Sequence, residues 1–137
     1  MRVTPTLVDS NVLIDILSRN SAWANWSSQA LVELGSEGPL IINTVIYAEV
    51  SQRYSRKEVL DRELPEDTFI RENIPWTAAF LAGKAYLDYR HRGGRRRSPL
   101  PDFFIGAHAA VAGLRLLTRD ESRYRTYFPT VDLIVPK

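Results

Sequence analysis

The sequence contains no cysteine, which excludes disulfide bonds, thiolate zinc sites and catalysis by a thiol nucleophile. It contains only two histidines, so we do not expect a metal centre built from imidazole ligands. No apolar run approaches the roughly 18 residues of a membrane-spanning helix, and Asp9 interrupts the apolar stretch that begins at Leu7. We therefore expect no membrane contact and no signal peptide, and the lack of cysteine suits a reducing, cytoplasmic location.

Length and composition indicate one folded domain over residues 1–137. Hydrophobic residues make up 45% of the chain and charged residues 25%, which is ordinary for a globular protein. This composition excludes disordered and collagen-like architectures.

The positive charge is concentrated in one short segment. The net charge is +2, yet residues 90–97 contain five arginines, namely Arg90, Arg92, Arg95, Arg96 and Arg97. Without them, 13 basic side chains would face 16 acidic ones, so the rest of the molecule is mildly acidic. A local basic segment indicates a polyanion partner such as RNA, although a solvated basic loop has the same composition. The candidate RNA-binding residues are Arg92, Arg95, Arg96 and Arg97.

Short apolar runs alternate with stretches of helical periodicity along the chain. Strands are expected over residues 6–8, 40–42, 114–117 and 131–135. Helices are expected over residues 11–19, 22–34, 56–64, 77–89 and 102–112, and in a segment capped by Thr44. Residues 66–76 show no clear pattern. Strands separated by helices predict an α/β fold, in which a parallel sheet has helices on both faces.

Four acidic residues fall near the carboxyl ends of the predicted strands, where such folds bind ligands. Asp9 directly follows the first strand, and Asp120 lies just past the third. Glu49 lies in the helix after the second strand, and Asp102 opens a later helix. Each acid alone also fits a structural role, such as a helix start or a turn. Their common placement, and the apolar neighbours of Glu49 and Asp102, predict a shared and partly buried acidic site.

A cluster of partly buried carboxylates must be neutralised by protons or by a cation. Oxygen ligands favour hard cations, so Mg²⁺ or Mn²⁺ fits this cluster better than zinc. Arginine holds phosphate groups, and the basic segment ends a few residues before Asp102. The combination of acids and arginines predicts a metal-dependent nuclease.

At these positions the chain resembles the PIN-domain ribonucleases, and most closely the toxins of the VapBC toxin–antitoxin type. The matching segments are Leu7–Asp15, Tyr47–Val50, Pro101–Ala109 and Leu117–Asp120. Any one of these segments alone would be a weak signal. All of them occur in the family's order and together they span most of the chain, which makes the resemblance fairly specific.

The resemblance implies a three-layer α/β/α sandwich with a parallel central sheet, and an acidic active site made of Asp9, Glu49, Asp102 and Asp120. Asp9 and Asp102 match the family's principal Mg²⁺ ligands, whereas Glu49 and Asp120 match acids that complete the site, directly or through water. Asn11 and Thr118 match its supporting polar positions. The metal ligands expected on this basis are Asp9, Asp102 and Asp120.

The resemblance also implies a biological role. Toxins of this family are endoribonucleases that cut structured RNA, often tRNA or ribosomal RNA. They usually form homodimers, and an antitoxin protein silences them. For this chain we expect hydrolysis that leaves a 5′-phosphate and a 3′-hydroxyl, with Glu49 or Asp120 orienting the attacking water. Whether one or two metal ions take part stays open.

Three other functions fit parts of the sequence. The first is a PIN nuclease of RNA processing without an antitoxin. The second is a phosphorylated receiver domain, which needs a lysine after a late strand, and no lysine of this chain lies at such a position. The third is an RNA-binding module without catalysis, which the presence of all four acids argues against.

Four further side chains invite a functional interpretation. We expect His108 and Asp15 to be structural, because helical spacing turns each of them away from the nearest acid. Trp23 and Trp26 are three residues apart and share a helix face. This spacing favours packing into the core, with an exposed patch for a partner as the alternative.

Overall fold

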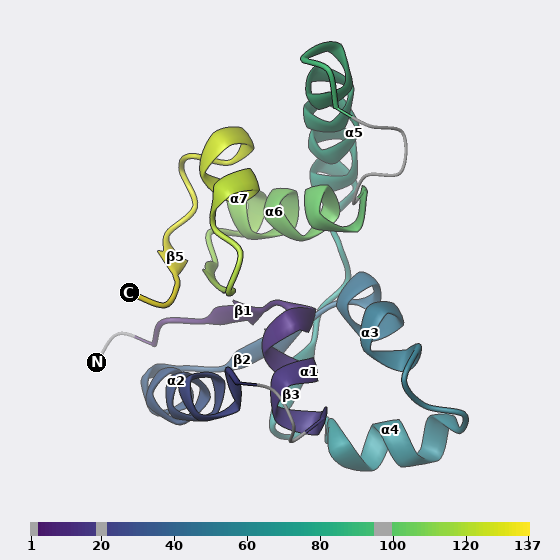
Figure 1. The fold of residues 1–137 in the computed structure, drawn as a ribbon, viewed down its shortest axis with the longest axis vertical. Coiled ribbons are helices and arrows are strands. Elements are labelled where there is room, and N and C mark those ends of the chain that lie inside the picture. Colours follow the sequence, from purple (N-terminus) through teal and green to yellow (C-terminus); the bar gives the residue numbers. More distant parts are fainter. Residues whose placement is uncertain (1–2, 19–21, 95–99) are drawn as a thin grey trace.

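The computed structural model describes residues 3–18, 22–94 and 100–137, and in these ranges five short strands alternate with seven helices (Figure 1). The strands are β1 (Thr6–Val8), β2 (Leu40–Ile42), β3 (Phe69–Arg71), β4 (Arg115–Leu117) and β5 (Leu133–Ile134). The helices are α1 (Ser10–Ser18), α2 (Ala24–Glu37), α3 (Thr44–Ser51), α4 (Lys57–Glu63), α5 (Trp76–His91), α6 (Leu100–Ala112) and α7 (Ser122–Tyr127). Within the described ranges, none of these helices has the length and apolar character needed to cross a membrane.

The strands form one parallel sheet in the order β3-β2-β1-β4-β5. Helices α5, α6 and α7 lie on one side of the sheet, and α1 and α2 lie on the other (Figure 1). This arrangement confirms the predicted α/β sandwich. Because helices cover both faces, the central strands are continuous apolar runs, and Leu7 and Val8 of β1 are completely buried.

Two elements were not expected from the sequence. Strand β3 lies in the stretch without a clear pattern, because only Phe69 of its three residues is buried while Ile70 and Arg71 are exposed. Helix α7 is six residues long and buries a single side chain, Tyr124. Each of these elements buries only one side chain, so neither has the continuous apolar run or the helical period by which the sequence pattern reveals the others.

The strand order reverses at β1, which pairs with β2 on one side and with β4 on the other. In open parallel sheets, a crevice forms beyond the carboxyl ends of strands at such a reversal. Asp9 follows β1 at this point, and its backbone N–H donates to the carbonyl oxygen of Leu117 at 2.9 Å. This bond brings the end of β1 beside Thr118, the first residue after β4.

A buried polar chain holds the neighbouring part of the same sheet edge. Asn43, and not Thr44, caps α3, since its Oδ1 accepts a hydrogen bond from the backbone N–H of Ile46 at 2.9 Å. The amide nitrogen of Asn43 therefore faces Nδ1 of His108 at 3.0 Å, which leaves Nε2–H of His108 to donate to Glu72 at 3.0 Å. His108 is completely buried, which confirms its expected structural role.

The candidate structural residues Asp15, Trp23 and Trp26 differ in how deeply they are buried. Asp15 is buried and accepts hydrogen bonds from Ser27 at 2.9 Å and from Arg119 at 2.6 Å, so its role is structural as expected. Trp26 is partly buried and packs against the core. The ring of Trp23 meets the ring of Trp26 edge-on, and Trp23 is 42% exposed. Core packing is therefore confirmed for Trp26 and is wrong for Trp23.

Gly106 allows α6 to approach the ring of Phe128 closely. Both residues are buried, and a Cβ atom on Gly106 would overlap that ring. We expect Gly106→Ala to lower the free energy of unfolding by about 1–3 kcal/mol, because it overpacks the core. Chemical denaturation measures this change.

The matched control is Gly83→Ala in α5, where no atom lies within 4 Å of the added Cβ. This variant should raise the free energy of unfolding by about 0.5–1 kcal/mol, since alanine loses less backbone entropy in a helix. Equal effects of the two substitutions would contradict the close approach of α6 to Phe128.

Candidate active site

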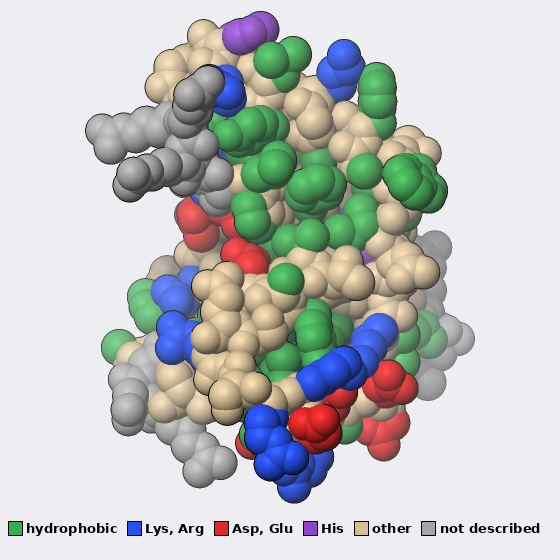
Figure 2. Space-filling model, turned by 90° about the vertical axis from the view of Figure 1, so that its right-hand side faces the viewer, with side chains coloured by type: hydrophobic (Ala, Val, Ile, Leu, Met, Phe, Trp, Pro, Cys, Tyr) green, Lys and Arg blue, Asp and Glu red, His purple; other side chains and the backbone are tan. Residues whose placement is uncertain are grey.

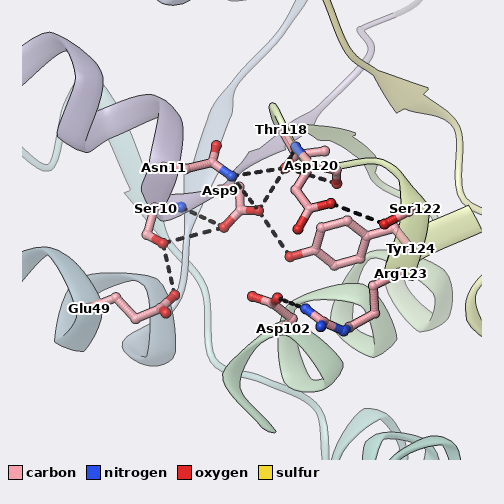
Figure 3. Close-up of polar contacts among 10 residues, drawn as sticks. All are labelled: Asp9, Ser10, Asn11, Glu49, Asp102, Thr118, Asp120, Ser122, Arg123 and Tyr124. Atoms are coloured by element: carbon pink, nitrogen blue, oxygen red, sulfur yellow. Dashed lines mark hydrogen bonds and ion pairs between the residues drawn. The ribbon is translucent and has the colours of Figure 1, made fainter. Parts of the chain in front are cut away.

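Asp9 lies among the polar side chains beyond the ends of β1 and β4 (Figure 3). It is only 3% exposed. Its Oδ1 accepts a hydrogen bond from the backbone N–H of Ser10 at 2.7 Å. Its Oδ2 accepts from the hydroxyl groups of Thr118 and Tyr124, both at 2.9 Å. These three donors fix the orientation of the carboxylate.

Asn11 and Thr118 form a second layer around this carboxylate. The side-chain nitrogen of Asn11 donates to the Thr118 hydroxyl at 3.2 Å, and it also approaches Oδ2 of Asp9 at 3.5 Å. Oδ1 of Asn11 accepts from the backbone N–H of Arg119 at 3.2 Å. The hydroxyl oxygen of Thr118 also accepts from the backbone N–H of Asp120 at 3.1 Å. Asn11 thereby links the start of α1 to the loop after β4.

Glu49 reaches the same region from α3. Its Oε1 accepts a hydrogen bond from the hydroxyl of Ser10 at 2.8 Å. The same hydroxyl lies 3.4 Å from Oδ1 of Asp9, so Ser10 stands between the two carboxylates. Glu49 is partly exposed and lies beside the group formed by Asp9, Asp102 and Asp120 (Figure 3).

Asp102 enters the site from the first turn of α6. Its Oδ2 accepts from Nη1 of Arg123 at 2.7 Å, in an ion pair whose two side chains are both mostly buried. Asp120 is more exposed, and the hydroxyl of Ser122 donates to its Oδ1 at 3.4 Å. The carboxylates of Asp9, Asp102 and Asp120 point toward one shared space, with Glu49 at its side (Figure 3).

Burial and mutual repulsion disfavour ionisation of Asp9, Asp102 and Glu49. Burial raises the pKa of Asp9 to about 6, against the hydrogen bonds from Thr118 and Tyr124 and with help from the charge of Glu49. Burial, and next the charge of Asp9, raise the pKa of Asp102 to about 6 although Arg123 opposes the change. The pKa of Glu49 is also raised, by burial first and by the charge of Asp102.

Tyr124 remains a hydrogen-bond donor in this environment. Burial raises its pKa well above the usual range, and the charges of Asp9 and Asp102 raise it further. The phenol therefore keeps its proton at neutral pH and can only donate that proton to Asp9. This assigns Tyr124 a fixed role in holding the Asp9 carboxylate.

The donor set fits a hard divalent cation, because it consists of carboxylate oxygens that face one space and repel one another. In the described part of the chain, no three acidic or histidine side chains form a ready-made metal site. Oδ2 of Asp102 is held by Arg123, and Oδ2 of Asp9 is held by two hydroxyl groups.

The basic segment is described only at its start. Arg92 is exposed, pairs with Asp88 at 3.2 Å and lies 5.7 Å from the ring centre of Tyr127. Arg95, Arg96 and Arg97 lie outside the described residues. Among the described arginines, Arg123 contacts an acid of the site, and sequence reasoning did not single it out.

Three residues in contact with the acids were missed from the sequence, namely Ser10, Arg123 and Tyr124. Arg123 and Tyr124 belong to α7, which no pattern indicated. The one available signal was their position three and four residues after Asp120, a candidate acid that follows a predicted strand.

A family model described as the PIN domain matches residues 6–129 of this chain. A comparison with curated protein sequences finds no match.

Solved structures of toxin–antitoxin systems have the same fold. VapBC2 from Rickettsia felis, bound to a DNA fragment from its promoter, gives a TM-score of 0.75 at 14% identity, covering 98% of this chain and 100% of that chain. VapBC-1 from nontypeable Haemophilus influenzae gives a TM-score of 0.73 at 16% identity, covering 96% of this chain and 98% of that chain. A toxin–antitoxin complex from Klebsiella pneumoniae gives a TM-score of 0.67 at 25% identity, covering 96% of this chain and 98% of that chain.

The raised pKa values of Asp9 and Asp102 predict how stability depends on pH. The folded state holds protons on these carboxyls that the unfolded chain has already released, so stability falls as pH rises from about 4 through about 6. In the presence of EDTA, we expect Asp9→Asn to raise the free energy of unfolding at about pH 7 by about 1–3 kcal/mol over the wild type.

This gain should disappear at about pH 4, where Asp9 of the wild type is itself protonated. Chemical denaturation at both pH values measures the difference. Asp67→Asn is the control, because Asp67 is exposed and lies in the connection between α4 and β3. A gain for Asp9→Asn that is the same at both pH values would refute the role of charge burial.

Proposed function

The chain belongs to the PIN-domain family, whose members are generally nucleases, and from this membership we propose that it is a metal-dependent endoribonuclease acting as the toxin of a toxin–antitoxin pair. One observation carries the proposal: acids from four separate segments of the chain meet at the strand reversal, and burial together with the charges of neighbouring acids raises the pKa values of Asp9, Glu49 and Asp102. A protein that lacked a cationic ligand for this cluster would keep the cost of the repulsion without any benefit.

In this proposal Asp9, Asp102 and Asp120 hold Mg²⁺ or Mn²⁺, and Glu49 completes the catalytic acids. The bound cation would supply charge stabilisation for the phosphodiester and lower the pKa of water. Asn11 and Thr118 support the site by keeping Asp9 oriented, through the bonds already described.

Glu49 is the residue best suited to orient the attacking water. It is partly exposed, and Ser10 holds one of its oxygens, which leaves the second oxygen to accept a hydrogen bond from water. Its raised pKa makes it a stronger base than an ordinary glutamate. Asp120 is the alternative, since it is the most exposed of the acids. Hydrolysis of this kind leaves a 5′-phosphate and a 3′-hydroxyl.

The proposed substrate is structured RNA, such as tRNA or ribosomal RNA, met in the cytoplasm. The support is the basic segment with Arg92, Arg95, Arg96 and Arg97, which would contact phosphate groups beside the acidic site. The proposed protein partner is an antitoxin. It is supported by the similar structures, among them VapBC2 from Rickettsia felis and a structure from Klebsiella pneumoniae that is described as a toxin–antitoxin complex.

The proposed homodimer has its own support on the surface of α5. Trp76 is 92% exposed, Phe80 69% and Leu87 48%, and hydrophobic side chains gather on this side of the molecule (Figure 2). Their spacing of four and seven residues places them on one helix face, with Gly83 leaving open space between them. The same face on a second copy would pack against it about a two-fold axis.

The nuclease proposal predicts cleavage of end-labelled tRNA and ribosomal RNA in Mg²⁺ or Mn²⁺ and none in EDTA. Asp9→Asn should lower the rate about a hundredfold or more, because it weakens a proposed metal ligand. Asp132→Asn, which alters an exposed acid remote from the site, should cleave like the wild type. Thermal unfolding of all three proteins confirms that they fold.

The products decide the type of reaction. Ends with a 2′,3′-cyclic phosphate would rule out the proposed hydrolysis by water. RNA binding without cleavage in any divalent cation would favour a non-catalytic RNA-binding module. Growth arrest on expression of the wild type, and its absence for Asp9→Asn, would support the toxin. Rescue by a neighbouring antitoxin would separate this role from RNA processing.

The dimer proposal predicts that Phe80→Glu weakens self-association about thirtyfold or more, the effect of losing one buried aromatic anchor. Val32→Glu on α2 is the control, because Val32 is 74% exposed but lies outside this face. Sedimentation equilibrium measures both dissociation constants. A wild-type protein that stays monomeric at high concentration would disprove the homodimer.

A further inference from the structure

The ion pair between Arg123 and Asp102 is the one ion pair of the described chain that involves an acid of the candidate site. Nη1 of Arg123 lies 2.7 Å from Oδ2 of Asp102. Glu49, Asp9 and Asp120 accept hydrogen bonds from hydroxyl groups instead. Arg123 therefore supplies positive charge at the point where Asp102 faces the other acids (Figure 3).

The fold holds the guanidinium group from two sides. Its carbon lies 5.6 Å from the ring centre of Tyr89 on α5, and Tyr89 packs in turn against Phe103 and Tyr127. The next residue after Arg123 is Tyr124, whose hydroxyl is bonded to Asp9. The backbone of α7 is thus anchored beside the site, and the arginine extends across an aromatic surface toward Asp102.

The pairing leaves much of the binding capacity of Arg123 unused. A guanidinium group has five N–H donors in a planar fork that matches two oxygens of a phosphate group. The structure records one hydrogen bond from Arg123 to Asp102, made by Nη1. The side chain is 24% exposed, so it is not sealed from solvent.

We propose that Arg123 is an internal counter-ion that holds Asp102 in the metal-free site and moves to a phosphate group of the RNA once a divalent cation binds Asp102. The inference rests on the proposed function and extends it to a residue outside the four acids. Two cations on one carboxylate oxygen repel each other, so the incoming cation displaces Arg123 from Oδ2. The phosphate then replaces Asp102 as its anionic partner.

This exchange couples the two ligands. A cation that releases Arg123 creates a phosphate-binding group, so RNA binds more tightly to the metal-loaded protein. Linkage requires the reverse as well, and RNA must strengthen cation binding by the same factor. Arg123 is thus a positioning residue of the free site and a phosphate ligand of the loaded one.

The first test is cation binding without RNA, by titration with Mn²⁺ at about pH 8, where carboxylates are ionised. Arg123→Gln removes the competing cation, and we expect Mn²⁺ to bind roughly tenfold more tightly, a change of about 1.4 kcal/mol. Arg123→Lys keeps the charge and should stay closer to the wild type. Arg125→Gln is the matched control, because Arg125 lies on the same helix and pairs with Glu121.

The second test measures the coupling. In a Glu49→Gln background, which retains the three proposed metal ligands but is expected not to cleave, a short RNA is titrated with and without Mn²⁺. We expect Mn²⁺ to strengthen RNA binding when Arg123 is present and to lose most of this effect in Arg123→Gln. Arg125→Gln should retain it.

The outcomes separate this inference from the proposed function. Unchanged or weaker Mn²⁺ binding by a folded Arg123→Gln protein would overturn the exchange while leaving the nuclease intact. Equal strengthening of RNA binding by Mn²⁺ with and without Arg123 would overturn it too. A wild-type protein that binds no Mn²⁺ at all would overturn the proposed function, and the exchange with it.

Discussion

The organisation of this protein depends on the repulsion among carboxylates that the fold forces together. Asp9 and Asp102 are mostly buried, and each raises the cost of ionising its neighbours. In the described part of the chain, hydrogen-bond donors and Arg123 offset part of that cost. Ser10, Thr118 and Tyr124 serve Asp9, and Arg123 serves Asp102. The surrounding polar network is therefore a consequence of the acids.

The sheet topology explains why the acids come from distant parts of the chain. The reversal of strand order places the ends of β1 and β4 side by side, although more than a hundred residues separate Leu7 from Leu116. Helices α3 and α6 then contribute one acid each from the adjoining edge. The buried chain through Asn43, His108 and Glu72 joins these helices to the end of β3, so the position of both depends on the same polar contacts. An error in the placement of one helix would disturb the whole cluster.

The family and the site make separate contributions to the functional argument. Membership of the PIN-domain family rests on a match over most of the chain, and similar folds at low sequence identity add nothing about substrate. The chemical case rests instead on charge, burial and donor type at named atoms. The small helix α7 connects the two, because its adjacent residues Arg123 and Tyr124 neutralise one acid and orient another. A short segment without a hydrophobic pattern thus controls the electrostatics of the site.

The sequence by itself determined the α/β class, most strands and helices, and the four candidate acids. Continuous apolar strands, helical periodicity and acids placed after strands are local signals that survive in any tertiary context. Only the tertiary structure decided that Ser10 bridges Asp9 and Glu49, that Asn43 caps α3 in place of Thr44, and that Arg123 pairs with Asp102 of the candidate site. The tertiary structure also revealed β3 and α7, which the sequence pattern did not predict. The physical reason is that the contacts of Ser10 and Arg123 join segments far apart in the chain. Asn43 and Thr44 are both favoured cap residues, so only the backbone geometry distinguishes them. Strand β3 leaves two of its three side chains exposed and α7 buries only one, so neither shows an apolar pattern.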